Sequence, residues 1–270
     1  MKKSGHTKVV QLLPIILLSL ICFNANAQKL PSTQKISLWA PDHIIIDGKA
    51  TEWGGKFQAY NSANHLFYTI ANDNKNLYLI VQSYSDLAVQ KITRWGITFT
   101  INSSLKKNAK DINNISISFP IEYEKGVGII RGVALGYLRN KSLVVNKDSL
   151  QKALNEKIVN AFKLIQISGV KGIDNGNISV YNSNGIKAAA LFDDKITYTY
   201  ELAIPLKYLN GSINEGTPFS YNIKLNAPVI NPRAPLAPMR VDGGRGPAED
   251  DQDYLFNPTD FWGEYTLAKK

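Results

Sequence analysis

The acidic residues near the C-terminus are the densest group of potential metal ligands in the sequence. Glu249, Asp250, Asp251 and Asp253 place four carboxylates within five positions. Calcium takes about six to eight oxygen ligands, so these side chains are candidates for a calcium site. Asp73 and its asparagine neighbours form a second, weaker oxygen cluster. Neither cluster matches the D-x-[DN]-x-[DN]-G spacing of a calcium loop, and solvated turns explain the same residues.

Residues that could catalyse a reaction are few. After the first 27 residues the only histidines are His43 and His65. The chain has neither the H-E-x-x-H pattern of zinc hydrolases nor the G-x-S-x-G pattern of serine hydrolases. A glycosidase would need two opposed carboxylates, and nothing in the sequence marks such a pair. The sequence therefore predicts a binding protein rather than an enzyme.

The start of the chain predicts export. Three lysines lie within the first eight residues, an apolar stretch covers residues 9–23, and Ala25-Asn26-Ala27 follows. This order is typical of a cleaved signal peptide. The apolar stretch is shorter than the roughly 20 residues of a membrane-spanning helix. We expect residues 1–27 to be removed, leaving no transmembrane segment, and the protein to reach the periplasm, the cell envelope or the exterior.

Composition limits the partners of the exported chain. The only cysteine, Cys22, lies in the predicted leader, which excludes disulfides and thiolate metal sites. The remaining chain has 28 basic and 22 acidic residues, a net charge of +6. The lysines are scattered and form no basic arm, so no nucleic-acid partner is expected.

Alternating apolar and polar residues predict an all-β fold. Strand-like segments of this number and spacing favour an antiparallel β-sandwich of jelly-roll or immunoglobulin-like type. The expected strands are residues 77–84, 96–101, 115–119, 195–204, 220–226 and 263–267.

One helix is expected to interrupt the strands, and one long loop to follow it. Asp148 and Gln151 suit a helix start, and apolar residues recur at helical spacing from Leu150 to Ile165. Residues 227–253 contain five prolines and the sequence Gly243-Gly244-Arg245-Gly246, which favours a loop. We therefore predict a single domain over residues 28–270.

Four segments stand in a recognisable order along the chain. They are Ile46-Asp47-Gly48 with Trp53, then Asp73 with Leu77-Tyr78, then Glu201 with Ile204-Pro205, and finally Phe261-Trp262-Gly263 with Leu267. Together they resemble the carbohydrate-binding modules of family 9 and their DOMON-like relatives. The resemblance covers residues 44–267 and implies a β-sandwich that holds sugar ends, often with bound calcium, and performs no chemistry.

The resemblance also implies where a sugar would bind. Family 9 modules hold the sugar between two tryptophans, and the matching positions here are near Trp95, beside Arg94, and near Tyr254 and Phe256. Exposed rings suit the apolar faces of sugars, and Arg240 and Arg245 in the glycine-rich loop could reach hydroxyl or carboxylate groups. Packing at a strand entry, or solvation of the loop, explains the same residues.

Two other functions fit the same fold. An accessory protein of the cell envelope would bind another protein and no sugar. Some DOMON-like relatives bind haem between a methionine and a histidine or lysine, for which this chain offers Met239 with His43 or His65.

Overall fold

The computed structural model describes residues 29–121, 129–130, 132–209, 213, 216–228 and 249–270. The chain divides into two compact units, Met1–Leu30 and Pro31–Lys270, and only the last two residues of the first unit are described. The predicted signal peptide, Met239, Arg240 and Arg245 lie outside the described residues. No helix in the described ranges has both the length and the apolar character needed to cross a membrane.

The first sheet, sheet A, has five antiparallel strands in the order β1-β2-β3-β9-β8. Its central pair, β3 and β9, is in register from Asn76 opposite Pro205 to Ser83 opposite Tyr198. The strands are β1 (Ala59–Asn61), β2 (Leu66–Asn72), β3 (Asn76–Ser83), β8 (Lys187–Phe192) and β9 (Tyr198–Pro205).

The second sheet, sheet B, has six antiparallel strands in the order β11-β10-β4-β5-β6-β7. Its outward face carries hydroxyl pairs between neighbouring strands, such as Thr98 with Ser118 at 2.7 Å and Thr100 with Ser116 at 2.9 Å. The strands are β4 (Ile97–Asn102), β5 (Ile115–Phe119), β6 (Leu164–Ser168), β7 (Gly176–Ser179), β10 (Phe219–Leu225) and β11 (Thr259–Tyr265).

The two sheets pack face to face, which confirms the predicted antiparallel β-sandwich. The inward-facing apolar residues of the two sheets form one hydrophobic core, so one face of each sheet is buried against the other. Tyr68 of sheet A and Tyr221 of sheet B meet through their hydroxyl oxygens, 2.9 Å apart. Phe119 and Tyr200 make a second contact across the core, with ring centroids 5.9 Å apart.

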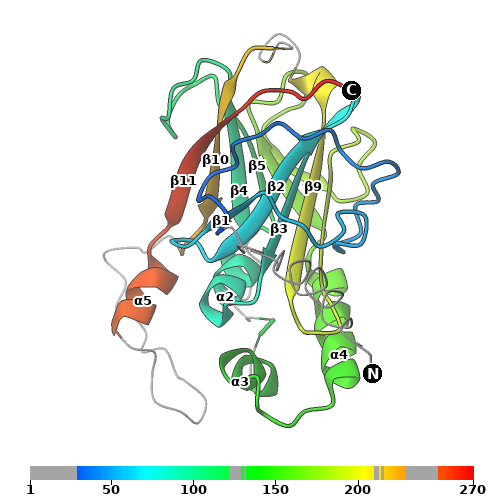
Figure 1. The fold of residues 1–270 in the computed structure, drawn as a ribbon, viewed down its shortest axis with the longest axis vertical. Coiled ribbons are helices and arrows are strands. Elements are labelled where there is room, and N and C mark those ends of the chain that lie inside the picture. Colours follow the sequence, from blue (N-terminus) through cyan, green and yellow to red (C-terminus); the bar gives the residue numbers. More distant parts are fainter. Residues whose placement is uncertain (1–28, 122–128, 131, 210–212, 214–215, 229–248) are drawn as a thin grey trace, which may run out of the picture. The chain divides into compact units, whose positions relative to one another are not determined.

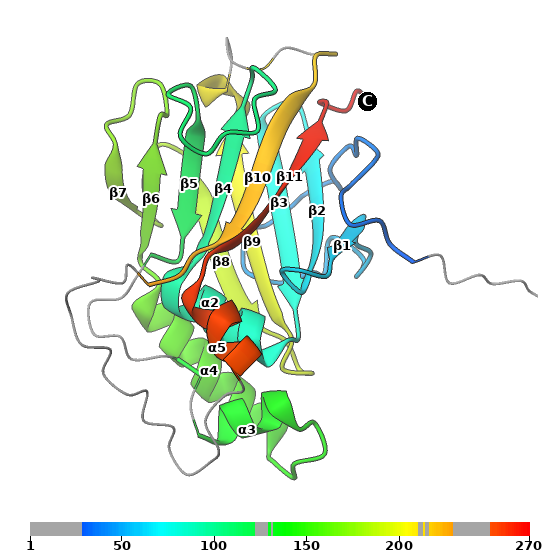
Figure 2. The same cartoon turned by 90° about the vertical axis from the view of Figure 1, so that its left-hand side faces the viewer.

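Helices gather at one end of the sandwich (Figures 1 and 2). The predicted helix is α4 (Lys147–Ala161), whose Leu154 and Ile158 are buried. Three further helices accompany it in the described residues: α2 (Asp86–Trp95), α3 (Val133–Arg139) and α5 (Glu249–Phe256). The described residues therefore contain four α-helices where the sequence predicted one.

Three local predictions were wrong. The N-cap of α4 is Asn146, whose side chain accepts a hydrogen bond from the backbone of Ser149, rather than Asp148. The helix ends at Ala161, so Ile165 lies in β6. The acidic residues from Glu249 onward form α5 rather than the end of a loop, because packing against α2 supplies stability that the isolated sequence lacks.

Candidate functional site

Helix α2 places Trp95 and Arg94 at the entry to sheet B. Ser85 caps its start by accepting a hydrogen bond from the backbone of Ala88. Gly96 ends it at φ 79°, and a Cβ atom there would lie 1.8 Å from the carbonyl oxygen of Pro120. Only glycine fits this turn, and the turn lets the chain pass directly from Trp95 into β4.

A buried lysine joins α2 to the end of α5. The side chain of Lys91 is fully buried. Its ammonium group donates to the backbone carbonyls of Tyr254 (2.7 Å) and Asn257 and to the hydroxyl of Thr259 (3.1 Å). Carbonyls at a helix C-terminus lack partners within the helix and carry partial negative charge, so a cation is favoured there. Lys91 thereby holds the C-terminal end of α5 against α2.

This arrangement brings together three of the residues predicted to bind a ligand. The rings of Trp95 and Phe256 lie 6.4 Å apart, tilted by 52°. The guanidinium of Arg94 lies 5.7 Å from the Trp95 ring. All three side chains are partly exposed. Trp95 and Phe256 contact each other, so the rings leave no slot for a sugar between them, and a ligand could only use their outer faces.

Tyr254, by contrast, packs against other parts of the protein. Its hydroxyl donates to the backbone carbonyl of Asn64 at 3.1 Å, and its ring lies 4.5 Å from the Lys91 ammonium and 5.5 Å from the His65 ring. Burial raises the pKa of Tyr254 above that of a free tyrosine. Its hydroxyl and one face of its ring are thus already in contact with protein.

The three described members of the predicted calcium cluster do not form a metal site. Asp250, Asp251 and Asp253 occupy neighbouring positions on α5, where successive side chains project about 100° apart. The described ranges contain no group of three His, Cys, Asp or Glu side chains that could hold a metal ion. The carboxylate of Asp73 accepts hydrogen bonds from the backbone of Lys75 and Asn76 and from the hydroxyl of Tyr78, which makes it a turn residue. The side chain of Glu249 lies outside the described atoms.

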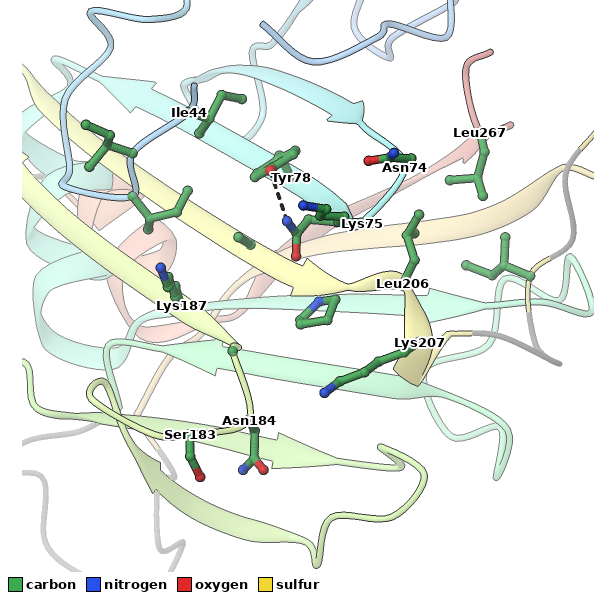
Figure 3. A pocket seen from close by; sticks show the side chains of 17 residues that line it. Ile44, Asn74, Lys75, Tyr78, Ser183, Asn184, Lys187, Leu206, Lys207 and Leu267 are labelled. Atoms are coloured by element: carbon green, nitrogen blue, oxygen red, sulfur yellow. Dashed lines mark hydrogen bonds between the residues drawn. The ribbon is translucent and has the colours of Figure 1, made fainter. Parts of the chain in front are cut away.

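A wide groove lies on the outer face of sheet A (Figure 3). Its volume is about 1040 Å³. We call it the lysine groove, because Lys75, Lys187 and Lys207 stand around it (Figure 3). Between them are the polar side chains of Asn74, Asn76, Tyr78, Ser183 and Asn184, and the apolar side chains of Ile44, Ile45, Ile46, Ala203, Pro205, Leu206, Ile213 and Leu267.

Glu201 fixes one wall of the lysine groove. It points outward from β9 and accepts hydrogen bonds from the backbone N–H groups of Asp47 (3.0 Å) and Gly48 (2.8 Å) and from the indole of Trp53 (2.9 Å). Gly48 has φ 83°, and a Cβ atom there would lie 2.6 Å from the backbone of Ala190. These contacts hold residues 46–53 against the sheet and so position the isoleucines before them.

The carboxyl group of Glu201 is fully buried under this segment. Burial raises the pKa of Glu201 to about 7, because the loss of water around the charged form outweighs the three donors. In the unfolded chain the group titrates near 4.5. The folded protein therefore holds this proton more tightly between about pH 4.5 and 7, and the stability contributed by Glu201 declines as the pH rises through that range.

The sequence did not indicate the lysine groove. Its lysines come from the β2–β3 turn, from β8 and from the 3₁₀ helix η1 (Leu206–Tyr208), and more than a hundred residues of chain separate Lys75 from the other two. Scattered lysines are ordinary surface residues in a sequence, so only the strand order brings them together. Ala203 and Pro205, in the segment of β9 to which the family resemblance pointed, line the groove.

Comparison with known proteins leaves the family open: no family model, no curated protein and no solved structure matches this chain.

Proposed function

We propose that this is an exported carbohydrate-binding protein without catalytic activity, which holds a sugar or the end of a glycan on its β-sandwich. The observation that carries the proposal is the pair of partly exposed rings, Trp95 and Phe256, with Arg94 beside them. Aromatic faces stack on the apolar face of a sugar ring, and a nearby guanidinium bonds hydroxyl groups.

Two features support a binding role over an enzymatic one. The aromatic pair is held by a rigid frame, since Lys91 and Gly96 fix α2, α5 and β4 relative to one another. The ionisable groups that surround the pair have structural partners, as Lys91 and Tyr254 do. A preformed platform of this kind binds a ligand without needing to rearrange.

Glycan binding is tested first on an array with the purified protein, run with and without calcium. Trp95→Ala should lower the affinity for a bound glycan about 5- to 10-fold, because it removes the larger stacking face, and Phe256→Ala should have a smaller effect. Titration calorimetry on the array's best ligand measures both. Calcium-dependent binding would support a role for the acidic residues of α5.

Tyr181→Ala is the matched control, because Tyr181 is 78% exposed and lies after β7, away from the pair. It should leave the affinity unchanged. An array without signal on protein with native circular dichroism would reject sugar binding and favour the accessory-protein alternative. If the Trp95→Ala variant kept full affinity, the sugar would bind somewhere other than the aromatic pair.

A further inference from the structure

We propose that the lysine groove is a second binding site, distinct from the aromatic pair, and that it takes an anionic oligosaccharide whose sugar rings carry carboxylate or sulfate groups. The inference goes beyond sugar binding at Trp95 and Phe256, and the two sites can succeed or fail separately. It is carried by the charge, the polar groups and the size of the groove.

The charge around the groove is of one sign. Lys75, Lys187 and Lys207 are exposed, and none of them forms an ion pair with a carboxylate in the described part of the chain. Among its described lining residues there is no Asp or Glu. Two carboxylates adjoin the lining in sequence, and both have partners: that of Asp73 is bonded to Tyr78 and to two backbone N–H groups, and that of Asp47 pairs with Lys49 at 2.7 Å. Like charges around one hollow attract anions and repel cations.

The three lysines surround the groove instead of sharing one side. Figure 3 shows Lys75 beside Tyr78, Lys187 on β8, and Lys207 extending toward Asn184. A single small anion would contact few of them at once. An elongated ligand with repeated negative charges can contact all three, which favours an oligomer over a free anion.

The uncharged lining suits sugar rings. Asn74, Asn76, Asn184 and Ser183 can donate and accept hydrogen bonds with hydroxyl groups. Ile44, Pro205 and Leu206 supply apolar surface for the C–H face of a pyranose. The volume of about 1040 Å³ reaches the upper end of the roughly 300–1,000 Å³ range of small-molecule sites, which leaves room for more than one ring.

The test compares oligogalacturonate with its methyl ester, which has the same rings without the charge. Calorimetry on the purified protein should detect binding of the acid form. Raising NaCl from about 50 to about 500 mM should weaken this binding. The triple variant Lys75→Met, Lys187→Met and Lys207→Met keeps the side-chain stems and should lose about tenfold in affinity. Lys171→Met, an exposed lysine in the β6–β7 turn, should change nothing.

A sulfated oligosaccharide of similar length forms the second arm of the test and distinguishes sulfate from carboxylate as the source of the negative charge. Tighter binding of either charged ligand than of the methyl ester supports the proposal. Equal affinity for the methyl ester would overturn it, as would the absence of binding to both charged ligands. Trp95→Ala should leave oligogalacturonate binding intact. Loss of that binding in Trp95→Ala, with no loss in the triple lysine variant, would assign the anionic ligand to the aromatic pair and overturn the groove.

Discussion

Replacing Glu201 with alanine should lower the free energy of unfolding by about 3–5 kcal/mol at pH 5, the largest effect we expect from a single side chain. The substitution leaves two backbone N–H groups and the indole N–H of Trp53 without their acceptor in a buried site. Each unsatisfied buried donor costs about 1–3 kcal/mol, reduced where water can enter. Urea unfolding followed by tryptophan fluorescence measures the change.

The loss should be smaller at pH 8 than at pH 5. The wild-type carboxyl has a folded pKa of about 7 and must ionise in its buried site as the pH rises, which removes part of its stabilising effect. Glu201→Gln should fall between wild type and alanine, because its amide offers an acceptor oxygen on only one side while donors approach both.

The matched control is Glu264→Ala on β11, whose ion pair with Lys107 is about half exposed on both sides. Exposed pairs of this kind contribute about 0–1 kcal/mol. If Glu201→Ala cost no more than Glu264→Ala, the contacts that hold residues 46–53 would not stabilise the fold. If both variants lost several kcal/mol, the effect would not be specific to the buried carboxyl.

Most strands predicted from sequence are interior strands of the two sheets, namely β3, β4, β5, β9 and β10, together with the edge strand β11. In β4, β9 and β10 apolar side chains recur at every second position. The interior strand β2 was not among the predicted strands. β1 and β7 are short edge strands, and the alanines of β8 carry little hydrophobic contrast. Their pairing depends on contacts with distant strands, which a local pattern does not record.

The candidate binding residues also divide into those that the sequence indicated and those that only the fold brings together. Trp95 and Phe256 were indicated by a family resemblance, and the structure places them in contact although 160 residues separate them. Glu201 was indicated by the same resemblance, but its hydrogen bond to Trp53 joins residues 148 positions apart. The lysine groove had no local signal, because none of its residues has a chemistry unusual for a surface.

Lys91 gives the second large expected effect, a rise in stability between about pH 8 and 9.5 that disappears in Lys91→Met. Burial lowers the pKa of Lys91 from 10.5 to about 8, because the charged form loses its water and gains no carboxylate in return. In this range the unfolded chain keeps a proton that the folded protein releases. Stability therefore increases with pH, by about 1–2 kcal/mol over the range.

The free energy of unfolding is measured only up to about pH 9.5, because at higher pH the core tyrosines change it in the opposite direction. Burial raises the pKa values of Tyr198 and Tyr200, so above about pH 10 the unfolded chain loses their protons first and stability falls. Lys152→Met, an exposed substitution on α4, should keep the wild-type rise. The same rise in Lys91→Met would assign the titration to another group. A weaker glycan affinity in Lys91→Met would in turn connect the end of α5 to the aromatic pair, because Lys91 is the contact that sets Phe256 beside Trp95.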